Sequence, residues 1–338
     1  MTFRGKSMGS LPHKHSMNVG LRTIFVVGKG GVGKTTCAAA TAFSLSKDYD
    51  TLIASLDPAH NLGDVLGTSL SGKAKKIKEN LWSLEVDMEG AIKSYLEESS
   101  SKLKNMYGYL KVINIEGYLD TIRLSPGIEE YATLREIERL ISEAEGKYEV
   151  IVFDTPPTGL TLRVLALPAI SLIWAEKLAK LRKTILSKRL AIEKIEGQKK
   201  FVLSGMEFKL STTEEKDEVM RELLNYMKEV GKVRELQTDS KRSIVMPVMN
   251  PDRLSLFETK RAFDTLEKLA MPIGNIVLNK FSGKREEIEI AAKVESALKK
   301  PIRKIPLLEQ EPIGMDSIEK FAGYLKVEEW LPQGRSNS

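Results

Sequence analysis

The stretch that decides the fold is Gly28-Lys29-Gly30-Gly31-Val32-Gly33-Lys34-Thr35-Thr36. It follows a β-branched and aromatic apolar run at 23–27, which suits a buried strand, and it precedes an alanine-rich run to Leu45 with strong helix propensity. Glycines in a strand-to-helix turn let backbone N–H groups close around phosphate oxygens, and the helix N-terminus adds its own unpaired donors. The sequence therefore predicts a phosphate-binding loop.

The polar side chains of this loop have separate predicted tasks. Lys34 should reach the phosphates of a nucleotide, and the Thr35 hydroxyl should hold Mg²⁺. Lys29 is unusual, because the loop pattern requires no residue type at that position and a cation beside Lys34 is repelled unless an anion compensates both. We interpret Lys29 as a functional cation, with a solvated surface lysine as the alternative.

Two aspartates follow other strand-like runs. Asp57 comes after the run at 51–56, and Asp154 comes after the run at 150–153. In open α/β sheets ligands bind beyond the carboxyl ends of the strands, so both aspartates should face the same edge as the loop. Asp154, behind four apolar residues, is typical of a carboxylate that holds Mg²⁺, while Asp57 leads a loop suited to positioning water. Each aspartate taken alone has a simpler alternative as a helix cap or turn residue.

Further strings resemble the ArsA/GET family, which contains arsenite-pump ATPases and the ATPase that delivers tail-anchored membrane proteins. Besides the glycine-rich loop they are "DPAHN" at 57–61, "SPGIEE" at 125–130, "DTPPTGLTLRVLALP" at 154–168, "MPVMNPDRLSLFETKR" at 246–261 and "IVLNKF" at 276–281. The resemblance covers the chain from about residue 20 to 325. It implies a P-loop NTPase fold of the deviant Walker A type: α/β, with a doubly wound, mostly parallel sheet and a helical insertion subdomain.

The resemblance also implies roles for individual residues. Gly28 to Thr36 bind the phosphates of ATP, and Lys29 crosses a dimer interface to the partner's nucleotide. Asp57 polarises the attacking water, and Asp154 assists Mg²⁺ through water. By this resemblance the chain is an ATPase that uses ATP and Mg²⁺, with Asp57 and Lys29 as its catalytic residues.

Three further positions belong to the implied nucleotide site. Asn279 reads the adenine edge, and Asn61, in the string at 57–61, contacts the nucleotide. Asp252 falls where the family usually places a glutamate that touches the partner subunit's nucleotide, and its side chain is one methylene shorter. Leu160 replaces a histidine that is common in the family, while the residues around it match.

Length and composition favour one large α/β domain, with 338 residues of which 42% are hydrophobic. We expect a disordered tail at 1–20, the ATPase domain at 21–330 with helical insertions at about 88–124 and 168–240, and a tail at 331–338. Residues 1–20 are polar and lack the apolar core of a signal peptide. No apolar run approaches the roughly 20 residues that a membrane-spanning helix needs. The resemblance implies a cytoplasmic protein with transient contact at the membrane surface.

Cysteine usage bears on metals. Cys37 is the only cysteine, and it should pack as a small apolar residue inside the first helix. The tail-anchored-protein ATPases usually carry a CxxC pair that binds zinc across the dimer, whereas this chain has neither cysteine nor histidine at 281–291. We therefore expect no zinc, and a homodimer held by packing, nucleotide and salt bridges.

The insertion at 168–240 has two apolar stripes at helical spacing. The first consists of Ile170, Trp174, Leu178, Leu181 and Ile185. The second consists of Val219, Leu223, Met227 and Val230. Residues 171–200 hold nine Lys or Arg and three Glu, a net charge of +6 that equals the formal charge of the whole chain. We interpret the stripes as a groove for an apolar helix, with mutual packing as a lid as the alternative.

These features favour an ATP-driven, homodimeric targeting factor or chaperone that captures the hydrophobic segment of a tail-anchored client and meets a membrane receptor. The ATPase subunit of an arsenite or oxyanion efflux pump is the alternative, but that branch resembles two fused halves with several cysteines. A third is a binding module in which nucleotide only stabilises the fold, and Asp57 and Lys29 argue against it. The basic segment lacks the interleaved aromatics of a nucleic-acid platform, so we expect no nucleic-acid partner.

Overall fold

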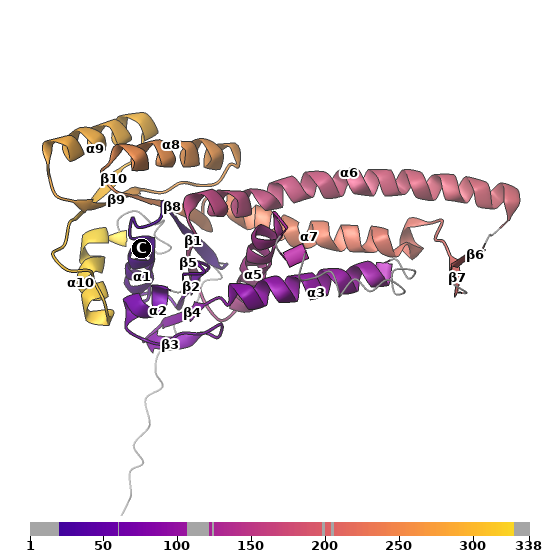
Figure 1. Cartoon of the computed structure of the whole chain (residues 1–338), viewed down its shortest axis with the longest axis horizontal. Helices are drawn as coiled ribbons and strands as arrows, with labels where there is room; N and C mark the ends of the chain where they lie inside the picture. Colours follow the sequence, from indigo (N-terminus) through magenta and orange to yellow (C-terminus); the bar gives the residue numbers. More distant parts are fainter. Residues whose placement is uncertain are drawn as a thin grey trace, which may run out of the picture.

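The computed structural model describes residues 20–59, 61–106, 122–123, 125–197, 200–203 and 206–327. They form an eight-stranded sheet with helices on both faces and a helical subdomain that projects to one side (Figure 1). The α/β, mostly parallel fold predicted from the sequence is confirmed. The expected tails, His60 and part of the insertion at 88–124 lie outside the described residues.

The strand order places the glycine-rich loop near the centre of the sheet. In spatial order the strands are β10 (Ile302–Pro306), β9 (Ile276–Phe281), β8 (Ser243–Met249), β1 (Arg22–Val27), β5 (Val150–Asp154), β2 (Thr51–Ser55), β4 (Leu81–Glu85) and β3 (Lys75–Lys78). β1 pairs in parallel with both β8 and β5, whereas β3 runs antiparallel to β4 at the edge. From β1 the chain passes to β2 on one side and later to β8 on the other, so a ligand crevice is expected beyond the carboxyl end of β1.

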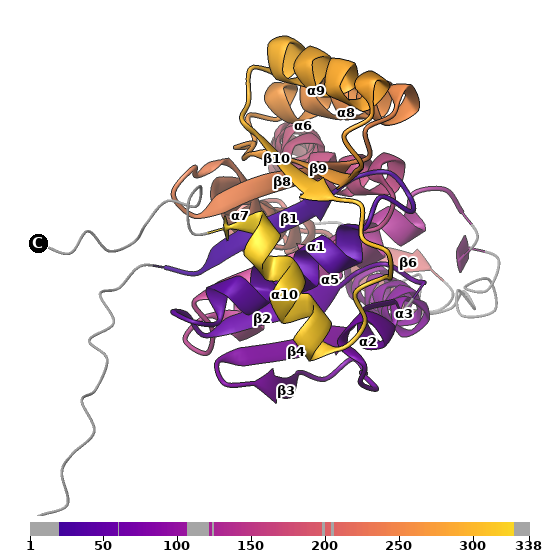
Figure 2. The same cartoon turned by 90° about the vertical axis from the view of Figure 1, so that its left-hand side faces the viewer.

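Helices cover both faces of this sheet. They are α1 (Lys34–Leu45), α2 (Asn61–Leu66), α3 (Met88–Met106), α5 (Ile128–Ala144), α6 (Thr158–Glu196), α7 (Glu218–Thr238), α8 (Arg253–Lys268), α9 (Arg285–Leu298) and α10 (Met315–Leu325). On one face Ile24 and Val26 of β1 pack in a core with α1 and α10, which lie side by side (Figure 2). On the other face Phe25 and Val27 belong to a core that includes α5, α8 and α9. Burial on both faces is typical of parallel strands.

The insertion predicted at 168–240 differs from expectation in two ways. Its first helix, α6, begins at Thr158 inside the "DTPPTGLTLRVLALP" string rather than near residue 168. Between α6 and α7 the chain also forms an antiparallel pair of strands, β6 (Lys200–Leu203) and β7 (Met206–Lys209), and a short 3₁₀ helix (Glu214–Lys216). The sequence "MEFK" alternates apolar and polar residues, and "KFVL" contains a short apolar run; both patterns suit a strand.

The two predicted apolar stripes differ in their exposure to solvent. α6 buries small residues at helical spacing, among them Ser171, Ala175 and Ala179, where it runs beside α7. Several of its large apolar residues remain exposed, including Trp174 at 61% and Leu181 at 57%. On α7, by contrast, the stripe turns inward and ends in fully buried Val230. The second stripe is therefore partly ordinary core, while the first is a free surface within the protomer.

α6 is also the one helix in the described part of the chain that is long and apolar enough to cross a membrane, with an 18-residue window of mean hydropathy 1.6. The expectation that no apolar run is long enough is wrong by this criterion. The helix packs on α5, α7 and α8, but only 33% of that window is buried. Most of this apolar window of α6 is therefore not buried in the core of the protomer.

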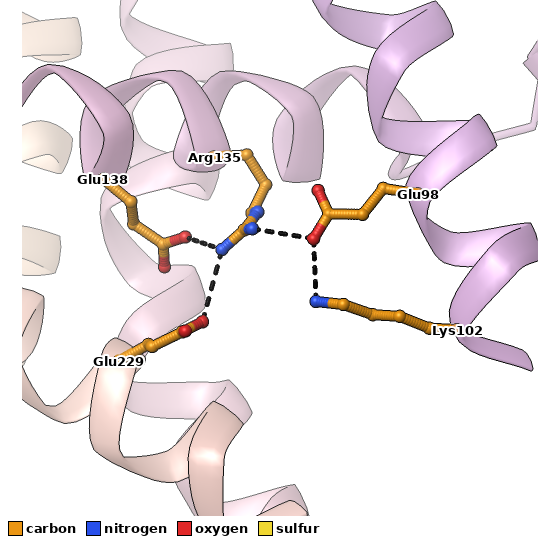
Figure 3. A network of polar contacts seen from close by, with 5 residues as sticks. All are labelled: Glu98, Lys102, Arg135, Glu138 and Glu229. Carbon is orange, nitrogen blue, oxygen red and sulfur yellow. Dashed lines mark hydrogen bonds and ion pairs between the residues drawn. The ribbon is translucent and has the colours of Figure 1, made fainter. Parts of the chain in front are cut away.

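An ion-pair network ties three helices of the subdomain together (Figure 3). Arg135 of α5 bonds Glu138 of its own helix at 2.8 Å, Glu98 of α3 at 3.0 Å and Glu229 of α7 at 3.5 Å. Lys102 bonds the same Glu98 at 2.7 Å. Burial outweighs the Arg135 contact and raises the pKa of Glu138. Because Arg135 bonds acidic groups of two other helices, it fixes the position of α5 relative to both α3 and α7.

A second ion pair fixes the start of α7, and we expect its loss to destabilise the protein. Asp217 is 3% exposed, accepts two hydrogen bonds from Arg182 of α6 at 2.9 and 2.7 Å, and caps α7 through the Met220 N–H. Burial opposes the charge, but Arg182 and the Met220 N–H outweigh it and hold the pKa of Asp217 below its ordinary value. Asp217→Ala should lower the free energy of unfolding by about 2–4 kcal/mol in urea titrations, because it removes the cap of α7 and the carboxylate that pairs with a largely buried arginine.

The neighbouring Glu218 supplies the control for that measurement. Its side chain is 56% exposed and pairs with Arg221 on the surface. Glu218→Ala should change the free energy of unfolding by less than about 0.5 kcal/mol. If Asp217→Ala and Glu218→Ala cost the same, the pair between α6 and α7 contributes nothing to stability.

Candidate functional site

The glycine-rich loop joins β1 to α1 at the carboxyl edge of the sheet, as the sequence predicts. α1 begins at Lys34, after Gly33 in the left-handed conformation with φ 91°. A Cβ on Gly28 would lie 2.2 Å from Val248 O, and one on Gly33 would lie 2.4 Å from the Asn279 amide nitrogen. Both positions therefore require glycine, one because β8 is so close and the other because of both its φ and the approach of β9.

Side chains hold three carbonyl groups of the loop. The Lys34 ammonium, on a side chain that is largely buried, donates to Lys29 O at 3.4 Å. The Asn279 amide donates to Val32 O at 2.8 Å, and the Lys280 ammonium donates to Gly31 O at 3.1 Å. Since Asn279 uses its nitrogen on the loop, its amide oxygen is the atom left to accept a hydrogen bond from an exocyclic amine such as that of adenine.

Asp154 ends β5 and is completely buried beside the loop. The Ser55 hydroxyl donates to its Oδ2 at 3.1 Å, and Thr35 and Lys34 lie near enough to influence its charge. Burial raises its pKa to about 6, although Thr35, Lys34 and Ser55 all act to lower it. Its Oδ1 is buried without a hydrogen-bond partner. The free carboxylate oxygen of Asp154 and the Thr35 hydroxyl are oxygen ligands of the kind that Mg²⁺ prefers. The ammonium of Lys34 beside them would pair with a phosphate.

Asp57 lies just beyond the end of β2 and lines the same cleft as Lys34 and Thr35. Its Oδ1 accepts a hydrogen bond from the Ala59 N–H at 3.1 Å, and its own N–H donates to the Ser55 hydroxyl at 3.4 Å. Ser55 thus bridges the two aspartates. Sequence reasoning missed Ser55, although its position as the last residue of β2, next to Asp57, was an available signal.

Lys29 and Asp252 are held outside the residues that line the cleft. The Lys29 ammonium pairs with Glu258 of α8 at 3.7 Å, and both side chains are partly exposed, at 40% and 34%. Asp252 caps α8, since its two oxygens accept from the N–H and the hydroxyl of Ser255 at 2.8 and 2.7 Å. Within one protomer, therefore, the side chain of Lys29 is held by α8, while its backbone carbonyl accepts from Lys34.

The cleft beyond the loop has a volume of about 650 Å³, which is within the range of small-ligand pockets. Asn61, Pro157, Asn279 and Lys280 contribute to its walls. Its remaining wall is the segment after β10, formed by residues 306–313. Sequence reasoning missed this segment, because only the parallel pairing of β10 with β9 brings its strand end to the site.

The raised pKa of Asp154 makes a stability prediction for the nucleotide-free protein. A carboxyl group with a pKa near 6 in the folded state and an ordinary value of 3.8 stabilises the fold below pH 4, and this contribution is lost as the pH rises through 6. Asp154→Asn should therefore match the wild type at pH 4 but be roughly 2–3 kcal/mol more stable at pH 7 in denaturant titrations. Adding Mg²⁺ and ADP should reverse the order at pH 7, because only the carboxylate can assist the metal.

The exposed aspartate Asp64 of α2 serves as the control for this pH series. Asp64→Asn should follow the wild type within about 0.5 kcal/mol at each pH. Parallel curves for Asp154→Asn and the wild type from pH 4 to 7 would contradict the raised pKa.

Comparison with known proteins places the chain among ATPases. The family described as "Anion-transporting ATPase" matches residues 21–327. A Paramecium tetraurelia protein named "ATPase ASNA1 homolog 2" is 30% identical over 336 residues, which cover 94% of this chain and 97% of that protein. A Chlorobaculum tepidum protein named as an arsenical pump-driving ATPase is 30% identical over 319 residues, covering 89% and 74%. A protein of Ajellomyces dermatitidis named "ATPase GET3" is 29% identical over 330 residues, covering 92% of each.

Proposed function

The chain belongs to the anion-transporting ATPase family, and from this premise we propose that it is a Mg²⁺-dependent, homodimeric ATPase that captures the apolar helix of a membrane-protein client. The observation that carries the proposal is the course of α6. Pro157, directly before this helix, lines the nucleotide cleft, while farther along the same helix Trp174 and Leu181 are largely exposed. One continuous helix therefore connects the phosphate site to an apolar surface.

Binding of ATP would use the loop and its neighbours. Backbone N–H groups of the loop and the Lys34 ammonium hold the phosphates. The Thr35 hydroxyl and the free oxygen of Asp154 are the groups that would hold Mg²⁺, which supplies neutralisation of phosphate charge when bound. The Asn279 amide oxygen accepts from the adenine amine, and Asn61, which also lines the cleft, contacts the nucleotide.

Hydrolysis would depend on Asp57 and Lys29. Asp57 lines the cleft and orients the attacking water, accepting its proton as the bond to phosphorus forms. Lys29 leaves its exposed pair with Glu258 and reaches the phosphates of the partner protomer, where its charge stabilises the transition state. Asp252, whose oxygens cap α8, would act at the interface by fixing the start of that helix.

Capture of a client would use the exposed face of α6. Several large apolar side chains on this helix are more than 40% exposed, namely Ile170, Ile173, Trp174, Leu178, Leu181, Ile192 and Ile195. Exposed apolar patches of this kind mark surfaces that are covered by another molecule, and a helix in a groove is the mode that uses anchors at helical spacing. We place the protein in the cytoplasm, with a membrane receptor as a transient partner and no role in nucleic-acid binding.

An oxyanion pump subunit is the second candidate, because relatives are named as arsenical pump-driving ATPases. Metalloid binding needs clustered thiolates. Cys37 is the only cysteine of the chain, it is fully buried, and burial raises the pKa of its thiol. This thiol is suited to packing inside α1. A single buried cysteine favours the client-capturing function over the pump subunit, and we expect Mg²⁺ to be the metal that the ATPase requires.

A paired assay with the purified protein separates the two candidates. In the presence of Mg²⁺ and ATP, a labelled apolar helical peptide of roughly 20 residues should bind, and antimonite should leave the ATPase rate within about twofold of its basal value. The matched control peptide carries aspartate at the apolar anchor positions. Strong stimulation by antimonite that Cys37→Ser abolishes, together with no binding of the apolar peptide, would favour the pump subunit instead.

A further inference from the structure

Lys280, the residue directly after Asn279, has a backbone conformation that is rare for a residue with a side chain. It stands near the end of β9 with φ 55°, in the left-handed region. Its ammonium donates to Gly31 O at 3.1 Å, while Asn279 donates to Val32 O at 2.8 Å. Two consecutive residues of β9 therefore hold two consecutive carbonyls of the glycine-rich loop.

The geometry of the peptide bond converts these contacts into an effect on phosphate binding. In a trans peptide the C=O and the following N–H point in opposite directions, and the described part of the chain has no cis peptide. Holding Gly31 O toward β9 therefore directs the Val32 N–H away from β9, and holding Val32 O does the same for the Gly33 N–H. Those N–H groups are the kind of donor that a phosphate-binding loop offers.

The side chain of Lys280 also forms part of the cleft itself. It lines the cleft next to Asn279, and the wall formed by residues 306–313 begins beside it, where Pro306 pairs with Phe281. The residue is exposed, so neither its charge nor its stem is needed to fill the core. A lysine that combines a strained backbone, a bond to the loop and a place in the cleft wall is better explained by a role in ligand binding than by one in folding.

We propose that Lys280 is a nucleotide-positioning residue, whose ammonium keeps the Val32 N–H directed at the phosphates and whose stem forms the wall beside the nucleoside. This inference rests on the proposed function, since it requires that the cleft binds ATP and ADP. It extends that function by giving β9 two positioning residues, Asn279 and Lys280. The ammonium and the aliphatic stem of Lys280 have separable effects on binding. Pyrophosphate contacts only the glycine-rich loop, whereas ADP also contacts the wall that the stem forms.

Calorimetric titration of the full-length protein with Mg²⁺ and either ADP or pyrophosphate tests the inference. Lys280→Met, which keeps a long apolar stem, should weaken both ligands by about 10-fold. Lys280→Ala should weaken pyrophosphate by the same factor and ADP by a further threefold or so. Lys280→Arg should restore both to within about threefold, since it can still donate to Gly31 O. In steady-state assays the KM for ATP should rise by more than kcat falls.

Lys284 supplies the matched control, because it is an exposed lysine four residues away and does not line the cleft. Lys284→Met should bind both ligands as the wild type does. Binding of ADP by Lys280→Met within twofold of the wild type would overturn the inference while leaving the proposed function intact. A wild-type protein that binds neither ADP nor ATP would overturn both.

Discussion

Asp57→Asn should lower kcat for ATP hydrolysis by at least about 10²-fold and change the Kd for ATP by less than about threefold. Asparagine keeps the size of the side chain and its ability to accept from the Ala59 N–H, but it cannot take a proton from water. The change therefore acts on the transition state and leaves ground-state binding to the loop. Phosphate release at saturating ATP measures kcat, and a separate titration of ATP binding measures the Kd.

Asp64→Asn is the matched control for this prediction. Asp64 lies seven positions further along, on α2, is exposed, and does not line the cleft. The same loss of one negative charge there should leave kcat within about twofold, because the Asp64 side chain is exposed to solvent and outside the cleft. Wild-type kcat in Asp57→Asn would assign the water-positioning role to another residue.

Leu181→Asp weakens capture of an apolar client helix by at least about 30-fold. Leu181 is 57% exposed in the middle of the apolar face of α6, so the substitution costs little in the free protein. In the complex the carboxylate would be enclosed by apolar side chains without a partner, which is unfavourable. Fluorescence anisotropy of a labelled apolar peptide, with Mg²⁺ and ATP present, measures the loss.

Ser187→Asp introduces the same charge on the same helix as a control. Ser187 is exposed and lies about 120° around α6 from Leu181, outside the apolar face. Its substitution should leave the peptide affinity within about threefold. Normal capture by Leu181→Asp would mean that the exposed face of α6 is not the client surface, and ADP binding by the same sample would exclude unfolding as the reason for a loss.

Local sequence patterns predicted the elements that bear the phosphate site. The apolar runs before Gly28, Asp57 and Asp154 are strands, and all three strand ends meet at one edge of the sheet. Such signals are contained within a few residues, namely a buried strand, a glycine turn and a helix former. The resemblance to the ArsA/GET family, drawn from the same strings, is confirmed by the family match over 21–327.

Long-range packing decided the features that local patterns did not predict. Val230 belongs to an apolar stripe in sequence, yet α7 buries it, whereas Leu181 of the equivalent stripe on α6 is exposed. The difference arises because α6 faces α7 with its small residues, such as Ala175 and Ala179. Likewise the pair of Lys29 with Glu258 depends on α8 lying beside the loop, which no spacing in the sequence encodes.

Under the proposed function, ion pairs would provide a physical route by which the nucleotide state reaches the apolar face of α6. Arg163 of α6 bonds Glu130 of α5 at 2.7 Å, and five residues later on α5 the Arg135 network reaches α3 and α7. Movement of α6 at the phosphate site would therefore be transmitted to the packing of the other subdomain helices. A packed helix can couple two sites when it has two stable positions and each site favours one of them. Switch loops that are ordered by the γ-phosphate and released on hydrolysis work in this way.

The rate of client release in different nucleotide states tests the central claim most directly. A labelled apolar peptide bound in the presence of Mg²⁺ and ATP should dissociate from the wild type at the rate of ATP hydrolysis. From Asp57→Asn it should dissociate at least about 10²-fold more slowly, because the ATP-bound state persists. Release at one common rate, unaffected by ATP, ADP or the Asp57 substitution, would contradict control of client capture by the nucleotide.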